Sequence, residues 1–104
     1  MTEKIKEALL DLNDNVYQYT AKGNQKVPYI VYGTDGENHL FGSDVRAERC
    51  DTGYIDLFTR QPRDVLMEAI PDALETAGVA FYLNSVQYEE DTGLIHCEWR
   101  WEAV

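Results

Sequence analysis

The closing stretch of the chain, residues 94–104, reads LIHCEWRWEAV. Its apolar residues alternate with polar ones, so they fall on one side of an extended backbone: Ile95, Cys97, Trp99 and Trp101. This period of two predicts an antiparallel strand with one face on a core. Tryptophans at that spacing are usually core residues, so we assign both to packing and not to the stacking of a ligand.

The residues before this strand complete a hairpin. Residues 79–88 are rich in β-formers, and residues 89–93 read EEDTG, an acidic turn whose glycine allows the positive φ of a tight turn. Further upstream, apolar residues recur at helical spacing from Val65 to Ala77 and end at Gly78. They predict a helix that Pro71 should kink or split.

The first half of the chain supplies one more helix and three strand candidates. Helical spacing of apolar residues predicts a helix over residues 3–12. Strands are expected over residues 16–20, 27–34 and 45–59, and Gly53 in the last of these suggests a bulge or kink. Residues 35–44 are expected to form a loop.

Together these elements predict a single α+β domain over residues 1–104. We expect an antiparallel sheet of about four to five strands with two helices packed on one face. Either Tyr29 or Ile30 should point into the core, and the pattern leaves open which one does. The other residues expected to be buried are Ile55, Leu57, Phe81, Leu83, Ile95, Cys97, Trp99 and Trp101.

The amino-acid composition argues against several classes of function. Nineteen acidic and nine basic residues give a net charge of −10, so specific nucleic-acid binding is not expected. Two cysteines, Cys50 and Cys97, make no disulfide framework and favour a reducing cytosol. We expect the protein to be neither exported nor membrane-bound. The sequence shows no signal-peptide pattern, and no apolar segment approaches the ~20 residues needed to span a bilayer.

Two patterns suggest chemistry and have simpler interpretations. The tripeptide Asp-Thr-Gly occurs at residues 51–53 and 91–93, and it carries the catalytic aspartate in aspartic proteases. Such a dyad needs an apolar surround, whereas the second copy follows Glu89-Glu90 and reads as a turn. We therefore expect no enzyme activity.

A metal site could be imagined from His39, Cys50, His96 and Cys97. However, adjacent strand residues such as His96 and Cys97 point to opposite faces, so they cannot easily bind one ion. We expect neither a metal nor another cofactor.

The loop expected at residues 35–44 contains two large apolar residues, Leu40 and Phe41, among glycines and polar residues. We predict that Leu40, Phe41 and the neighbouring His39 are interface anchors that become covered when another protein binds. The alternative is that this loop folds back over the sheet and buries them within one subunit.

The order of elements resembles the tail-completion (tail-terminator) proteins of long-tailed bacteriophages and prophages. The likeness lies in the N-terminal helix, in VPYIVY at residues 27–32, in GYIDLFT at residues 53–59 and in CEWRW at residues 97–101. Each of these is a strand or helix packing pattern, and none is a catalytic signature.

The resemblance implies a homo-oligomeric ring, expected to be a hexamer, that caps the tail tube. Its implied partners are the tail-tube protein and the head connector, and its implied location is the virion tail, with assembly in the host cytoplasm. Negative charge suits a ring through which DNA must slide without sticking. Alternatives are another head–tail joining or minor structural protein, or a protein-binding module outside the virion.

Overall fold

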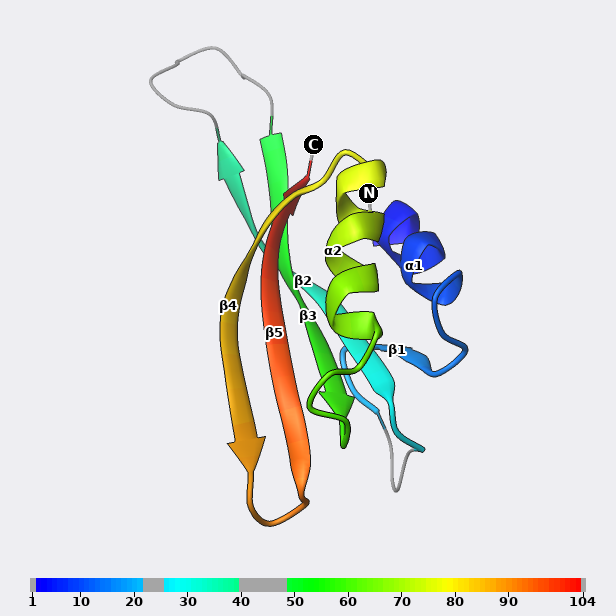
Figure 1. Cartoon of the computed structure of the whole chain (residues 1–104). Coiled ribbons are helices and arrows are strands. Elements are labelled where there is room, and N and C mark those ends of the chain that lie inside the picture. The colour runs from blue at the N-terminus through cyan, green and yellow to red at the C-terminus, as the bar shows by residue number, and fades with distance from the viewer. Residues whose placement is uncertain (1, 22–25, 40–48, 104) are drawn as a thin grey trace.

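The structure is a computed structural model that describes residues 2–21, 26–39 and 49–103. Within these ranges, two helices cover one face of a five-stranded sheet (Figure 1). The elements are α1 (Thr2–Leu10), β1 (Val16–Gln18), β2 (Tyr29–His39), β3 (Arg49–Thr59), α2 (Leu66–Thr76), β4 (Ala80–Glu89) and β5 (Leu94–Ala103). The predicted α+β fold is therefore confirmed. Neither described helix is long and apolar enough to cross a membrane.

The strand order is β1-β2-β3-β5-β4, and the pairs β2–β3, β3–β5 and β5–β4 are antiparallel. In contrast, β1 pairs with β2 in parallel, from Val16 beside Ile30 to Gln18 beside Tyr32. The sheet is thus mixed, whereas the sequence predicted an antiparallel one. Ten residues separate β1 from β2, which is longer than a tight hairpin loop and returns the chain to the end where β1 began.

The core fills the space between the sheet and the helices. In α1, Ile5 and Leu9 lie one turn apart and are both fully buried. Ile30 is the inward residue of the undecided pair, since it is buried while Tyr29 is only half-buried. The remaining large core residues are Tyr32, Ile55, Leu57, Leu66, Ile70, Leu74, Val79, Cys97, Trp99 and Trp101. Partly buried Phe81 and Ile95 pack against them.

The start of α2 is held by Asp64. One of its carboxylate oxygens accepts the Leu66 backbone N–H at 2.9 Å, and the other accepts the hydroxyl of the buried Thr59 at 2.6 Å. The helix runs through Pro71 as one element, so the alternative in which Pro71 splits it is wrong. It ends at Thr76, and Gly78, two residues later, has a φ of +75° that suits the position just past a helix terminus.

The predicted C-terminal hairpin is confirmed as β4 and β5. The Gly93 N–H closes the turn by donating to the Glu89 carbonyl at 2.8 Å, and its φ is +72°. The side chain of Arg60 donates to the Thr92 carbonyl at 3.0 Å and ties this turn to the end of β3. The turn is therefore held both by its own backbone and by the residue that follows β3.

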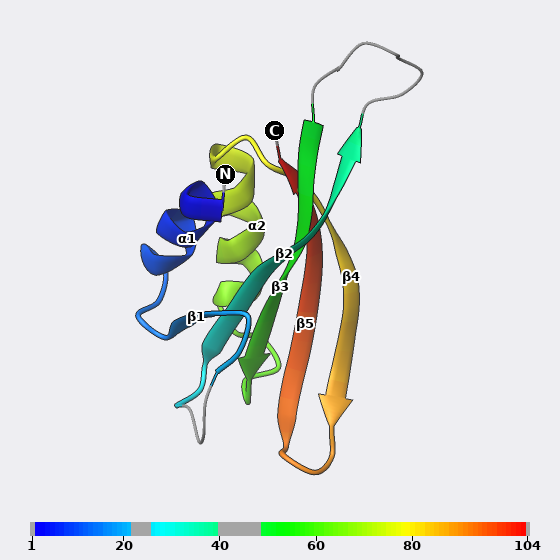
Figure 2. The same ribbon diagram turned by 180° about the vertical axis from the view of Figure 1, so that it is seen from behind.

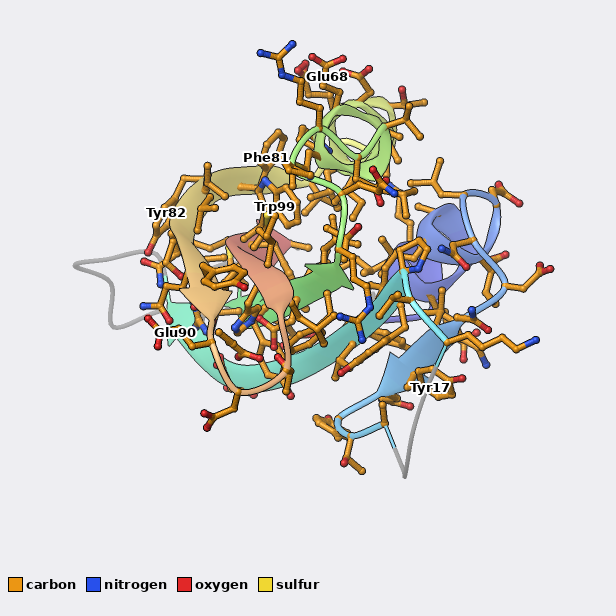
Figure 3. The ribbon with its side chains drawn as sticks, turned by 60° about the horizontal axis from the view of Figure 1, so that its bottom comes forward. Tyr17, Glu68, Phe81, Tyr82, Glu90 and Trp99 are labelled. Carbon is orange, nitrogen blue, oxygen red and sulfur yellow. The ribbon has the colours of Figure 1, made fainter. Side chains whose placement is uncertain are left out.

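One burial prediction in this hairpin is wrong, because Leu83 is 52% exposed. β4 forms the edge of the sheet, at the end opposite to β1 (Figure 1). Phe81 still packs against the core, whereas about half of the Leu83 surface remains in contact with solvent. Figure 3 shows Phe81 and Trp99 on the side of the sheet that faces α2, with Tyr82 at the outer edge.

The segment expected to be a loop is partly a strand. β2 continues to His39, and its last pairs with β3 run from Gly36 beside Thr52 to His39 beside Arg49. The expected irregularity at Gly53 does occur at that level of the sheet, but the extra residue is Asp35, in the opposite strand. Residues 40–48 lie outside the described residues.

Candidate assembly surface

The face of the sheet opposite the helices, here called the outer face, carries a row of stacked rings. Tyr17 meets Tyr29 edge to face with ring centroids 6.4 Å apart. Tyr29 stacks on Phe58 at 4.7 Å, and Phe58 stacks on His96 at 4.4 Å. These residues come from β1, β2, β3 and β5, so the row crosses most of the sheet. Figure 2 shows the backbone of these strands from behind. Sequence reasoning missed this row, because the four rings become neighbours only once the strands are paired.

Acidic groups surround the histidine at the end of this row. Nε2 of His96 lies 3.0 Å from Oδ1 of Asp56, and Nδ1 lies 3.7 Å from Oε2 of Glu89. The first contact is short but poorly aligned for a hydrogen bond, and we regard it as mainly a charge interaction. Asp56 raises the pKa of His96 above its ordinary value, while burial acts in the opposite direction. The protonated form of His96 is therefore stabilised relative to that of an ordinary histidine.

A second charged contact spans the outer face nearer the other end of the sheet. Arg100 in β5 donates two hydrogen bonds to Asp35 in β2, at 2.7 and 3.0 Å, across the intervening β3. Thr52 in β3 donates a longer bond of 3.4 Å to the same carboxylate. The Arg100 guanidinium lowers the pKa of Asp35. The bulge at Asp35 thus places its carboxylate where β5 can hold it.

Large apolar side chains are exposed along β4. Four of the seven strongly exposed large hydrophobic residues in the described ranges belong to this strand: Tyr82, Leu83, Val86 and Tyr88. Leu83 pairs with Trp99 and so lies on the helix side, as its alternation with Phe81 predicted, but the edge position of β4 leaves it exposed. The outer face and β4 are the two surfaces of the described residues best suited to contacts with another protein.

Of the three residues predicted to anchor an interface, only His39 belongs to the described part of the chain. The backbone of His39 closes β2, while Leu40 and Phe41 fall in residues 40–48, outside the described ranges. Their interface role therefore stays a prediction.

The two Asp-Thr-Gly segments lie far apart within one chain. Asp51 pairs with Ala103 at the end of β5, whereas Asp91 is in the turn just before β5 begins. About 30 Å, the length of a ten-residue strand, separates these positions. A carboxylate dyad cannot form from them within one subunit.

The imagined metal ligands are also separated. Cys97 is buried on the helix-covered face, and His96 lies on the outer face beside Phe58. Burial raises the pKa of the Cys97 thiol, which disfavours the thiolate that binds metals. Among the described residues, no group of three or more potential metal ligands comes together.

Comparison with known proteins finds a similar structure but no family or curated protein with a matching sequence. No protein-family model matches the chain, and no curated protein matches it. Among solved structures, the chain is similar to a chain from the virion of a native gene transfer agent particle. The two share 13% sequence identity with a TM-score of 0.58, over 98% of this chain and 88% of that one. They have the same fold.

Proposed function

We propose that this chain is a structural protein of a phage or phage-like virion. The observation that carries the proposal is that the fold likeness to the virion chain covers nearly all of this protein and most of its counterpart. A fold can host many functions, so the surface must also suit the role. The net charge of −10 and the exposed apolar residues of β4 suit a subunit whose contacts are with other proteins.

Within the virion, the role that fits best is tail completion. In this proposal the chain forms a ring, expected to be a hexamer, that caps the tail tube and joins it to the head connector. The sequence resemblance supports this role, and the acidic composition supports it physically, because DNA that passes through the ring would not adhere to an acidic wall. His39, Leu40 and Phe41 are proposed as contacts of this ring with its neighbours.

Deletion of the gene in the strain that produces the particles tests the proposal. We expect DNA-filled heads and separate tails in electron micrographs, with joined particles restored by a wild-type copy supplied in trans. Mass spectrometry of purified wild-type particles should detect the chain at a few copies per particle, as a single ring requires. Normal joined particles from the deletion strain would refute any essential role in the virion.

The same micrographs separate tail completion from its alternatives. Heads that have lost their DNA would indicate a head-completion protein, because the defect would then lie on the head side of the junction. Particles that contain none of the chain would indicate a protein-binding module outside the virion.

A further inference from the structure

Strand β4 leaves one side of its backbone open at the edge of the sheet. Among the described residues it pairs with β5 alone. Proteins commonly protect such edges with lysine, proline or an inward charge, and residues 80–88 contain none of these. They belong to the longest uncharged run of the chain, residues 76–88, although 27% of all residues are charged. An open edge with this composition favours pairing with another strand.

The register shift at Asn84 keeps four apolar side chains of β4 on one face of the sheet. Leu83 is opposite Trp99 and Val86 is opposite Cys97, and both of these partners face the helices. Apolar residues before the shift have odd numbers and those after it have even numbers, yet all of them remain on the helix side of the sheet. The resulting row on the helix side consists of Phe81, Leu83, Val86 and Tyr88.

This row is symmetric about Ser85 when the bulged Asn84 is left out of the ladder. If β4 of a second copy lay antiparallel beside it, with Ser85 next to Ser85 of the second copy, Leu83 would face Val86 and Phe81 would face Tyr88. Each apolar residue would meet an apolar residue, and each such contact would occur twice. Glu89, the one charged residue in β4, would face Ala80, so no carboxylates would meet.

We infer that the free protein forms a twofold dimer through antiparallel pairing of β4 with β4 of a second copy. A second copy is the best-suited partner because its own edge carries the matching row and is uncharged over residues 80–88, which matters for a chain with a net charge of −10. A twofold contact closes after two copies and cannot continue around a ring. The inference thus goes beyond the proposed function and does not depend on it.

Light scattering coupled to size-exclusion chromatography tests the dimer on the isolated protein. The wild-type chain should have the mass of a dimer, and Leu83→Lys should raise the dimer dissociation constant roughly tenfold or more, because two lysines would enter an apolar contact. Leu10→Lys is the matched control, since Leu10 is 41% exposed on α1, away from β4. It should leave the mass unchanged, and both variants should keep the secondary-structure signal of the wild type in circular dichroism.

A disulfide at the symmetry axis tests the register. In a Cys50→Ser background, Ser85→Cys should form an intermolecular disulfide readily, because the two positions would be directly opposite. Gln87→Cys should not form this disulfide. The two copies of position 87 would be separated by about four residues along the strands, roughly 13 Å, which is too far for a disulfide. A monomeric wild-type chain at millimolar concentration overturns the inference, as does a dimer that Ser85→Cys fails to cross-link. A larger ring that Leu83→Lys dissociates also overturns it, because β4 would then be a ring contact.

Discussion

The indole ring of Trp101 lies over Gly53, its direct neighbour across the β3–β5 ladder. A Cβ atom on residue 53 would overlap both the ring of Trp101 and the carbonyl oxygen of Gly33. The indole N–H also donates to the Tyr54 carbonyl at 3.2 Å. The largest core side chain and the residue without a side chain are therefore fitted to one another.

Replacing Gly53 by alanine should destabilise the protein. The added methyl group has a backbone atom on one side and a buried indole on the other, so relief requires a shift of the sheet. We expect the free energy of unfolding in urea to fall by about 1 to 3 kcal/mol. Gly36→Ala is the control, because its nearest atom is the Thr52 hydroxyl oxygen at 3.0 Å, and its loss should be smaller. Equal losses would contradict the role assigned to Gly53.

Removal of the Trp99 indole should leave a large cavity. Trp99 is 3% exposed between the sheet and α2, and tryptophan-to-alanine changes in cores cost ~3 to 5 kcal/mol. The melting temperature should fall accordingly. Val65→Ala is a suitable control, since Val65 is 80% exposed and its truncation should change stability by about 0.5 kcal/mol or less. A Trp99→Ala variant that melts like the wild type would refute the burial.

His96 should make stability depend on pH near neutrality. Its pKa is raised in the folded protein by the adjacent Asp56 carboxylate, so the folded state binds the proton more tightly than the unfolded state. The stabilising contribution is full below the ordinary value of 6.5 and is lost as the pH rises through the folded pKa. Urea denaturation of wild type and His96→Asn between pH 5 and pH 9 should show the difference shrinking as pH rises. An NMR titration that places the pKa of His96 at or below 6.5 would contradict this.

The contact between Asp35 and Arg100 should show a small, salt-sensitive coupling. Both side chains are partly exposed, at 38% and 28%, so solvent screening limits the coupling to about 1 kcal/mol or less in a double-mutant cycle with Asp35→Asn and Arg100→Gln. Because the pKa of Asp35 is lowered, the contribution is present above 3.8 and is lost as the pH falls through the folded pKa. A coupling that does not weaken in 1 M salt would argue against an electrostatic contact.

The double substitution of Leu40 and Phe41 by serine tests the interface prediction made from the sequence. If these residues anchor a neighbouring protein, particle joining should fail while the melting temperature of the isolated chain is unchanged. Leu10→Ser, at an exposed helical position, serves as the control for the loss of a surface apolar residue. A large drop in the melting temperature with normal joining would instead support burial of the loop within one subunit.

Much of the fold could be predicted because the spacing of apolar residues within an amphipathic helix or strand reveals its type. The alternation in residues 94–103 identified β5 and its inward residues, and the helical spacing of Ile5 and Leu9 identified α1. These signals are local, since one face of each element must be apolar wherever the element lies in the fold. The net charge is also a property of composition alone, and it is the basis for expecting no binding to nucleic acid.

Only the tertiary structure decided which elements became neighbours. The parallel pairing of β1, the stack of Phe58 on His96 and the exposure of Leu83 all depend on strand order, register or a single bulged residue. Phe58 and His96 are 38 positions apart, and a shift of one residue in the pairing of β3 with β5 would send one of them to the other face. Local periodicity carries no information about that register, because it is selected by the simultaneous packing of the whole sheet against both helices.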